Sequence, residues 1–530
     1  MPTARGDAAP PSEVIIGLDV GTTGVKAVAF GLGARWERIA IREYPLLQPA
    51  PNQQVQDPAM ILTAAADALA ECVAGVGRAK VLAISLSAGM HGLMALDEEL
   101  RPLTPLITWA DARAHEEARS LRRSGQAGEL HAHTGVPVHP MTPLTKLMWF
   151  ARHDPDTWAA ARWWVGLKEY ILLWLTGSLV TELSSASGTG LLEMSTRDWS
   201  PAALALSGVS AGQLPDILPT TATLELASAP ADAAGLPAGT PVVAGAADGP
   251  CGNLGTGAIT PGIAGLSLGT SGAVRMAVDA PHVDADGTLF CYALTESLWV
   301  AGSAISTGGG IVRWAGRSLA PDVQAAPGDA GPDAAVLELA ASVPAGSEGL
   351  VMLPYLVAER APLWDPDLPG AYLGLRREHT RAHMVRAGVE GVCVQMRLIL
   401  DRVDELAPVS SVRVTGGVFR SALWREVMAA MLDRPLHIVG DAEGTALGAA
   451  TLGVYALGRA PTLPDAAAQL DDPGVSPPAP VEADPQLVAT YDRLRASVPE
   501  LIRPLGSVSG LFAGLSEDGA AAAAARVADV

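Results

Sequence analysis

The feature that most constrains the fold is a short motif that occurs twice. LDVGTTGVKAV at residues 18–28 reappears as LSLGTSGAVRM at residues 266–276. Each copy has an apolar run, a glycine-bounded turn with hydroxyl side chains and a second apolar run, a pattern that predicts a β-hairpin. The turn residues align pairwise: Gly21, Thr22, Thr23 and Gly24 with Gly269, Thr270, Ser271 and Gly272. Two copies so far apart in the chain indicate two related domains, each presenting one such turn.

The first turn carries groups that suit an anion. It matches neither GxxxxGK followed by Ser or Thr nor GxGxxG leading into a helix, the two common phosphate-binding patterns. Its backbone N–H groups and hydroxyls would still form a donor surface for phosphate oxygens. Asp19, just before the turn, is placed to ligate a Mg²⁺ ion on those phosphates. The plainer interpretation is a tight structural hairpin, and Lys26 suits a surface ion pair as well as a phosphate.

Composition excludes several classes of protein. The chain has 530 residues and a net charge of −20, which disfavours nucleic acid and anionic membranes as partners. No apolar run reaches the ~20 residues of a spanning helix, and residues 1–12 lack a signal-peptide core. The isolated cysteines argue against a zinc site or disulfides: Cys72, Cys251, Cys291 and Cys393. We therefore expect a cytoplasmic protein whose oligomeric state, a homodimer included, stays open.

The order of predicted elements is that of an α/β protein. Helices are predicted at 58–74 and 381–406, and a buried strand at 81–87. Strands followed by glycine-rich turns are predicted in PVVAGAADG, VRVTGGVF and PLHIV. We expect an N-terminal domain at 13–257 and a C-terminal domain at 258–505. Residues 1–12 and 516–530 are predicted to be disordered tails, and 471–485 a surface loop.

Two of these glycine-rich turns could carry chemistry. Asp248 follows an apolar strand, where a carboxylate could accept the proton of an attacking alcohol or simply cap a helix. Gly416 and Gly417 would let a flat ring such as adenine approach the backbone, or merely end a strand. The histidine pairs at 131/133 and 379/383 lack the further ligands of a zinc site.

Taken together, these residues resemble the FGGY family of carbohydrate kinases, from about residue 14 to residue 459. MTPLTKLMWFARH (141–153), with Lys146 and Trp149, is similar to the first family signature, and GAYLGLRREHTRAHMVRAGVE (370–390) is similar to the second. The second signature departs from the family pattern at Gly388, where a slightly larger residue is usual. Because Gly388 lies in a predicted helix, this departure affects packing and not the chemistry. The resemblance implies a two-domain α/β actin/hexokinase/Hsp70-like ATPase fold, built from duplicated ribonuclease H-like domains with an interdomain cleft.

The resemblance also implies roles for individual residues. Asp248 would be the catalytic base, and Asp19, with Asp248, would lie at the Mg²⁺ site. ATP would be held by Gly21, Thr22, Thr23, Lys26, Gly269, Thr270, Ser271, Gly416, Gly417 and Ser421. The sugar would contact Met90, His91, Trp109 and Asp111.

The substrate is also suggested by resemblance. Segments 87–113, 167–177 and 184–199 are similar to the gluconate-phosphorylating members of the family, with xylulose kinases as the alternative. At Gly89 and Ala110 the chain departs from the Gln and Asn usual in xylulose kinases. A non-catalytic sugar sensor is disfavoured because Asp19, Asp248 and both hairpins are retained. Gluconate carries a carboxylate that some cation should bind, the candidates being Arg113, Lys168, His91 and His139.

Overall fold

The computed structural model describes residues 4–5, 11–34, 36–325, 332–357, 359–366, 368–440, 444–471, 478–502 and 504. The chain divides into two compact units that interleave in sequence. Unit 1 comprises Met1–Gly265, Arg275–Ala301 and Asp441–Pro477; unit 2 comprises Leu266–Val274, Gly302–Gly440 and Pro478–Val530. The contiguous domain limits 13–257 and 258–505 stay a prediction. Of the predicted tails, Ala4–Arg5 form the short strand β1, whereas residues 1–3, 6–10 and 516–530 lie outside the described part.

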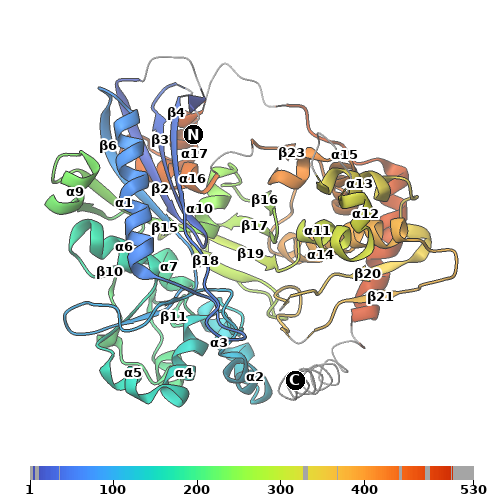
Figure 1. Cartoon of the computed structure of the whole chain (residues 1–530), viewed down its shortest axis with the longest axis horizontal. Coiled ribbons are helices and arrows are strands. Elements are labelled where there is room, and N and C mark those ends of the chain that lie inside the picture. The colour runs from blue at the N-terminus through green and yellow to red at the C-terminus, as the bar shows by residue number, and fades with distance from the viewer. Residues whose placement is uncertain are drawn as a thin grey trace, which may run out of the picture. The chain divides into compact units, whose positions relative to one another are not determined.

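Unit 1 is built on a seven-stranded sheet of order β1-β4-β3-β2-β6-β15-β14 (Figure 1). Its strands are β2 (Glu13–Val20), β3 (Gly24–Gly31), β4 (Glu37–Glu43), β6 (Lys80–Ala88), β14 (Thr223–Glu225) and β15 (Pro241–Ala247). Strand β2 pairs antiparallel with β3, as the first hairpin motif predicted, and parallel with β6, which pairs parallel with β15. The carboxyl ends of β2, β6 and β15 therefore meet at one edge of the sheet.

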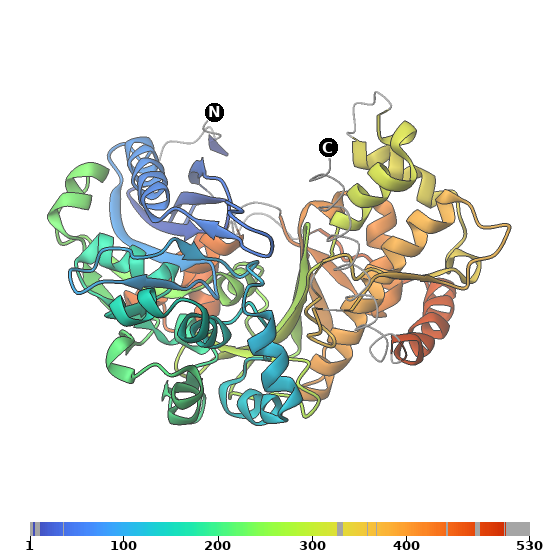
Figure 2. The same cartoon turned by 60° about the horizontal axis from the view of Figure 1, so that its bottom comes forward.

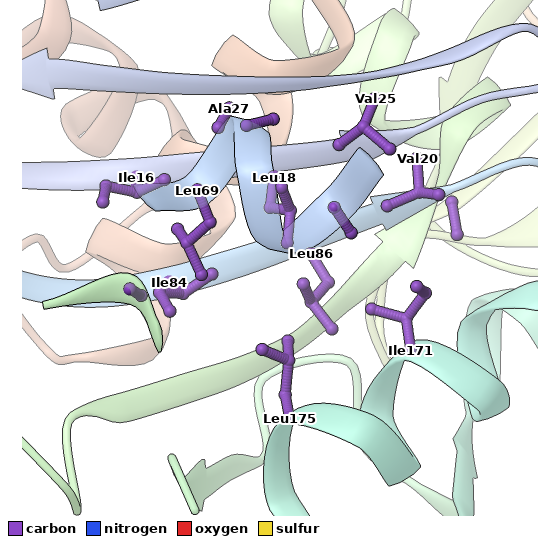
Figure 3. Packing of buried hydrophobic residues seen from close by; sticks show 14 of the residues in the cluster. Ile16, Leu18, Val20, Val25, Ala27, Leu69, Ile84, Leu86, Ile171 and Leu175 are labelled. Carbon is purple, nitrogen blue, oxygen red and sulfur yellow. The ribbon is translucent and has the colours of Figure 1, made fainter. Parts of the chain in front are cut away.

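Helices cover both faces of this sheet. Helix α1 (Pro58–Gly75) packs on β3 and β4, and α16 (Gly444–Ala456) packs on β2 and β6 (Figure 1). Successive side chains of a strand point to opposite faces. Ile16 and Leu18 accordingly join a core with Leu69 of α1 (Figure 3), whereas Ile15 packs with Ala446 of α16. A strand buried on both faces needs the unbroken apolar run that β2 has.

Helix α1 begins where its sequence dictates. Asp57 caps it by accepting the Ala59 N–H at 2.8 Å, and Pro58 occupies the first turn, where no N–H is needed. The helix predicted at 58–74 is thus confirmed. Among the described helices, α1 alone has the length and mean hydropathy (1.3) of a membrane span, but its buried residues, including Ile61 and Leu69, pack in the core of unit 1.

The other elements of unit 1 are shorter. The helices are α2 (His115–Arg123), α3 (Gln126–Thr134), α4 (Pro143–His153), α5 (Pro155–Ala160), α6 (Leu167–Thr176), α7 (Leu183–Ser187), α8 (Pro201–Ser207), α9 (Ser228–Ala234), α10 (Asp248–Gly255) and α17 (Leu463–Leu470). The strands are β5 (Val55–Gln56), β7 (Met94–Leu96), β8 (Leu106–Ile107), β9 (Trp163–Val165), β10 (Val180–Glu182), β11 (Leu192–Glu193), β12 (Asp198–Trp199) and β13 (Asp216–Leu218).

A second, six-stranded sheet has the order β18-β19-β17-β16-β22-β23. Its strands are β16 (Ile263–Leu268), β17 (Gly272–Val278), β18 (Phe290–Ala293), β19 (Trp299–Ile305), β22 (Ser411–Thr415) and β23 (Leu436–Ile438). The neighbours β16 and β17 flank the second copy of the hairpin motif. The limits of the two units fall within β16, β17 and β19.

Unit 2 is rich in helices around α14 (Arg381–Leu406), which has the limits predicted from sequence. Helix α14 packs against α11 (Gly310–Leu319), α13 (Pro332–Ala341) and α15 (Ala422–Leu432) (Figure 2). Short elements complete the unit: α12 (Pro321–Gln324), β20 (Val351–Leu353) and β21 (Ala371–Leu373). The signature residue Gly388 is buried in α14, where an added Cβ would lie 3.0 Å from Ile311 of α11, so the missing side chain is explained by helix packing.

Candidate active site

Three predicted site segments follow adjacent strands of unit 1 at the same edge of the sheet. Asp19 near the end of β2 lies beside Ser87 of β6, whose hydroxyl donates to the Asp19 carboxylate at 2.9 Å. Ala88 at the end of β6 pairs in turn with Ala247 of β15, and Asp248 follows at the first residue of α10. Ligands bind at the carboxyl ends of parallel strands in such sheets. The fold therefore brings Asp19, the loop after β6 and Asp248 to one edge of the sheet.

The first glycine turn is fixed by hydrogen bonds within the turn and from neighbouring side chains. The Gly21 N–H donates to the Gly24 carbonyl at 2.9 Å, and the Tyr44 hydroxyl donates to the Gly21 carbonyl at 2.6 Å. The indole N–H of Trp109 donates to the Thr22 hydroxyl at 2.9 Å. A pocket beside the turn is lined by residues that include Gly21, Thr22, Met90 and Trp109. Two predicted phosphate residues and two predicted sugar residues thus share one pocket.

Asp19 and Lys26 face each other across the hairpin. They are directly paired in the register of β2 and β3, and both are partly exposed. Opposite charges at such positions attract each other. Among the described residues, no three or more His, Cys, Asp or Glu side chains lie close enough together to hold a metal ion by themselves. Mg²⁺ is commonly bound by one or two carboxylates together with phosphates and water, so the Asp19 carboxylate beside a hydroxyl-rich turn fits that ion.

The loop after β6 is strained and is fixed by a buried lysine. His91 has φ = 63°, a left-handed conformation that is uncommon for a residue with a side chain. The Lys146 ammonium donates to the carbonyls of His91 at 2.6 Å and Thr108 at 2.8 Å. Burial lowers the pKa of Lys146 to about 7, and Asp111 opposes this shift. Strained backbone persists only where the surroundings over-determine it, and Lys146 is part of those surroundings.

Asp248 is held in one orientation by backbone donors. Its carboxylate accepts the Gly249 N–H at 2.7 Å and a hydrogen bond from the Met90 backbone. Burial raises the pKa of Asp248 above its ordinary range, while the Arg275 guanidinium opposes the shift. A base works best when its pKa lies closer to neutrality than that of a solvated carboxylate. Asp248 therefore has the environment of a general base as well as the position of a helix start.

The buried Lys168 side chain forms hydrogen bonds with backbone carbonyls near the ends of β6 and β15. Its ammonium donates to the carbonyls of Leu86 at 3.1 Å, Ala244 at 3.0 Å and Ala246 at 2.9 Å, and lies 3.9 Å from the Glu182 carboxylate. An ammonium has three N–H donors, so those of Lys168 are all used on backbone oxygens. Lys168 thus joins the two strands that position Asp248.

The Asp111 side chain is buried and forms an ion pair with Arg113. Its carboxylate accepts the Gln54 N–H at 2.8 Å and binds the Arg113 side chain through two bonds, at 2.8 and 2.9 Å. The Arg113 guanidinium also lies over the Trp149 ring, 5.1 Å from its centre. The structure therefore gives Asp111 the role of anchoring the segment that carries Trp109.

Unit 2 brings together three glycine-rich turns. In the second hairpin the Gly269 N–H donates to the Ser271 carbonyl at 2.9 Å. The Gly309 N–H donates to the Gly269 carbonyl at 2.7 Å, which adds the turn 308–310 to this cluster. Gly416, with φ = 118°, lies so close to Leu268 that an added Cβ would be 2.1 Å from its carbonyl oxygen. Thr270 and Gly417 lie in these turns, and Ser421 follows as the residue before α15.

Sequence reasoning missed several site residues. The turn 308–310 was missed although its three consecutive glycines before a helix were a visible signal. Arg275 was missed although it is the one charged residue in the strand GAVRMAV. Phe290 and Tyr292, whose rings stack with centres 4.3 Å apart, gave no signal because their contacts with the site depend on sheet order.

Comparison with protein families gives two consecutive matches. Residues 14–255 match the N-terminal domain of the FGGY family of carbohydrate kinases, and residues 264–457 match the C-terminal domain of that family. Together the two matches span most of the chain and include all the predicted site residues.

Individual relatives agree with this match. The chain is 36% identical over 450 residues to a gluconokinase of Bacillus subtilis, covering 84% of this chain and 88% of the relative. A solved gluconate kinase from Lactobacillus acidophilus superposes with a TM-score of 0.88 at 31% identity, covering 94% of this chain and 99% of that chain. A ligand-bound xylulose kinase from Lactobacillus acidophilus superposes with a TM-score of 0.87 at 31% identity, covering 94% and 100%.

Proposed function

Because the chain belongs to the FGGY family of carbohydrate kinases, it is a phosphotransferase with the actin/hexokinase-like fold, and we propose that it phosphorylates D-gluconate at the C6 hydroxyl. The products would be 6-phosphogluconate and ADP. The observation that carries the chemistry is the half-buried Asp248 carboxylate at the start of α10, oriented by the Gly249 and Met90 backbone. The similarity to gluconate-phosphorylating relatives supports the choice of acceptor.

Asp248 is proposed as the general base. The C6 hydroxyl would bind within hydrogen-bonding distance of this carboxylate, which accepts the hydroxyl proton while the oxygen bonds to the γ-phosphorus of ATP and the bond to ADP breaks. Such transfers pass through a loose transition state, so orientation of the acceptor contributes more than its activation. The two backbone donors to Asp248 serve that orientation.

Met90, His91 and Trp109 are proposed to contact the sugar. All three line pockets of unit 1 next to the ends of β2 and β6. Lys146 would maintain the His91 conformation, and Asp111 would act through the segment that carries Trp109. Both residues are buried and engaged with protein groups, which supports a positioning role for them rather than contact with the acceptor.

Two sets of glycine-rich turns are proposed to bind the nucleotide. Thr22 and Thr23 of the first hairpin and Thr270 and Ser271 of the second would donate to phosphate oxygens, and Lys26 would add charge. Gly21 and Gly269, whose N–H groups close the turns, would let the phosphates approach the backbone. Gly416, Gly417 and Ser421 would lie along the adenosine. Family members use ATP, generally with a divalent metal, and here Mg²⁺ would be ligated by Asp19, with Asp248 near it. Bound there, the ion would neutralise phosphate charge. We also expect the protein to act in the cytoplasm.

A xylulose kinase is the second candidate. The specific observation in its favour is the superposition of a solved xylulose kinase at a TM-score of 0.87, nearly that of the gluconate kinase. Both acceptors end in a primary hydroxyl, so the base and the glycine turns suit either one. A non-catalytic sugar sensor is disfavoured because both Asp19 and Asp248 are present.

The experiment is ADP release in a coupled assay with Mg-ATP and D-gluconate, D-xylulose, L-ribulose or glycerol. Turnover that is fastest with D-gluconate, and a product with its phosphate on C6 by NMR, supports the proposal. Turnover with D-xylulose alone would be consistent with Asp248 as the base but would show that D-gluconate is the wrong acceptor. ATP binding without turnover on any sugar would favour the sensor.

A further inference from the structure

Arg275 is the one charged residue of an apolar strand. Strand β17 reads GAVRMAV, and Arg275 is its one residue that is partly open to solvent; the other residues are buried. A guanidinium in apolar surroundings is costly unless charges or hydrogen bonds compensate it. Such a residue with access to solvent is therefore a candidate for binding a ligand.

The surroundings hold Arg275 beside the proposed base. A Cβ built at Gly249 would lie 3.4 Å from Nε and 3.5 Å from Nη2 of Arg275, so the guanidinium lies at van der Waals distance from the residue that follows the proposed base. On another side the guanidinium carbon lies 6.0 Å from the centre of the Phe290 ring. Asp248 and Tyr292 both interact electrostatically with Arg275. These contacts fix a positive group next to the acceptor site.

The aromatic neighbours connect Arg275 to the sugar loop. Phe290 stacks on Tyr292, and the Tyr292 ring lies edge-on to His91 with ring centres 5.8 Å apart. The His91 Nδ1 atom in turn lies 2.8 Å from the Gly188 carbonyl. Arg275, the two aromatic rings and His91 therefore form a continuous series of contacts close to Asp248 and Met90.

Three other cations near this site are occupied by protein groups. Lys168 donates to three carbonyls and lies near Glu182. Lys146 donates to the carbonyls of His91 and Thr108, and Arg113 forms two bonds to the Asp111 carboxylate. Arg275 is distinguished by its place beside the Asp248 carboxylate, with Gly249 and the Phe290 and Tyr292 rings among its neighbours.

We propose that Arg275 is the specificity-determining residue that binds the carboxylate of a sugar-acid substrate. The inference rests on the proposed function, because it presumes an acceptor with an acid group. A guanidinium has five N–H donors in a planar fork, so it can bind a substrate carboxylate in addition to interacting with Asp248. Gluconate has an open, flexible chain, which can curve so that its hydroxyl end meets Asp248 and its acid end meets Arg275.

The test compares Arg275→Met and Arg275→Lys with wild type on an acid and its neutral counterpart. D-Glucitol has the carbon chain of D-gluconate with CH₂OH in place of the carboxylate. The readouts are kcat/KM for D-gluconate and, with a non-hydrolysable ATP analogue present, the dissociation constants of D-gluconate and D-glucitol. Arg42→Met is the matched control, because Arg42 lies on β4 and pairs with Glu71 at the surface.

We expect Arg275→Met to weaken D-gluconate binding and lower its kcat/KM about 100-fold. Binding of D-glucitol should change by less than about threefold, because no charge is paired in that complex. Arg275→Lys should retain part of the preference, and Arg42→Met should match wild type. Equal losses for acid and polyol, or no loss for the acid, would overturn the role of Arg275.

The outcome also separates this inference from the proposed function. If wild type phosphorylates a different sugar acid and Arg275→Met selectively loses that acid, the choice of gluconate is wrong and the role of Arg275 is supported. If wild type acts on neutral sugars only, both are overturned.

Discussion

The position of the proposed base depends on a close contact between two helices of unit 1. Gly448 on α16 packs against α10, the helix that begins with Asp248. A Cβ added at Gly448 would lie 1.9 Å from the Cys251 carbonyl oxygen on α10, whereas real Cβ atoms essentially never come closer than 3.0 Å to such an atom. Gly448→Ala therefore requires the two helices to separate by roughly 1 Å, the difference between these distances.

The expected magnitude follows from this displacement. Overpacking of this kind lowers the free energy of unfolding by about 1–3 kcal/mol. Because the backbone atom that is struck belongs to α10, part of the movement should reach Asp248. A shift of about 1 Å in a reacting group can cost about 100-fold in rate. Gly448→Ala should therefore lose both stability and kcat, although residue 448 does not contact a substrate in the proposed site.

The same helix offers a matched control. A Cβ added at Gly444 would meet no described atom within 4 Å, so Gly444→Ala should be tolerated or stabilise α16 by about 0.5–1 kcal/mol. The assays are calorimetric unfolding and coupled turnover with saturating substrates. If Gly448→Ala is as stable and as active as Gly444→Ala, the reasoning from α10 packing is refuted.

Other perturbations test separate parts of the account. Since burial lowers the pKa of Lys146 to about 7, the unfolded chain binds one more proton than the native protein between about pH 7 and 10. As the pH rises through that window, the free energy of unfolding of wild type should increase relative to that of Lys146→Met by up to about 1.4 kcal/mol per pH unit. A difference in unfolding free energy, measured with urea, that stays constant with pH would contradict this. Gly416→Ala should weaken ATP binding and lower stability by about 1–3 kcal/mol through its clash with Leu268. Gly417→Ala, with no described atom within 4 Å of the added Cβ, should keep stability; equal Tm losses in calorimetry would refute the distinction. Asp19→Asn should raise the Mg²⁺ concentration for half-maximal turnover about tenfold or more, and an unchanged Mg²⁺ titration would exclude Asp19 as the ligand.

Local sequence signals were sufficient for the elements that carry the site. The first hairpin, α1 and α14 were all predicted because apolar periodicity, Pro58 and glycine turns act over a few residues. Asp248 could be singled out because it follows an apolar strand directly, although capping and catalysis could not be separated without its neighbours. Only the fold shows that it lies beside Met90 and Arg275.

The remaining features depend on contacts between distant segments. Lys146 was visible as a signature residue, but its bond to the strained His91 backbone joins positions 55 residues apart. Lys168 was one of four candidates for binding the substrate carboxylate, yet its ammonium donates to backbone carbonyls of β6 and β15. Sheet order, which local patterns do not specify, brings these groups together.

The most direct test of the central claim is gluconate-dependent ADP release by wild type and Asp248→Asn, with ATP affinity measured in parallel. Asparagine keeps the size of the side chain and removes its ability to accept the proton as a carboxylate. The account predicts that turnover falls at least about 100-fold while the Kd of ATP changes by less than about twofold. Turnover within a few-fold of wild type would show that Asp248 is not the base and would contradict the account.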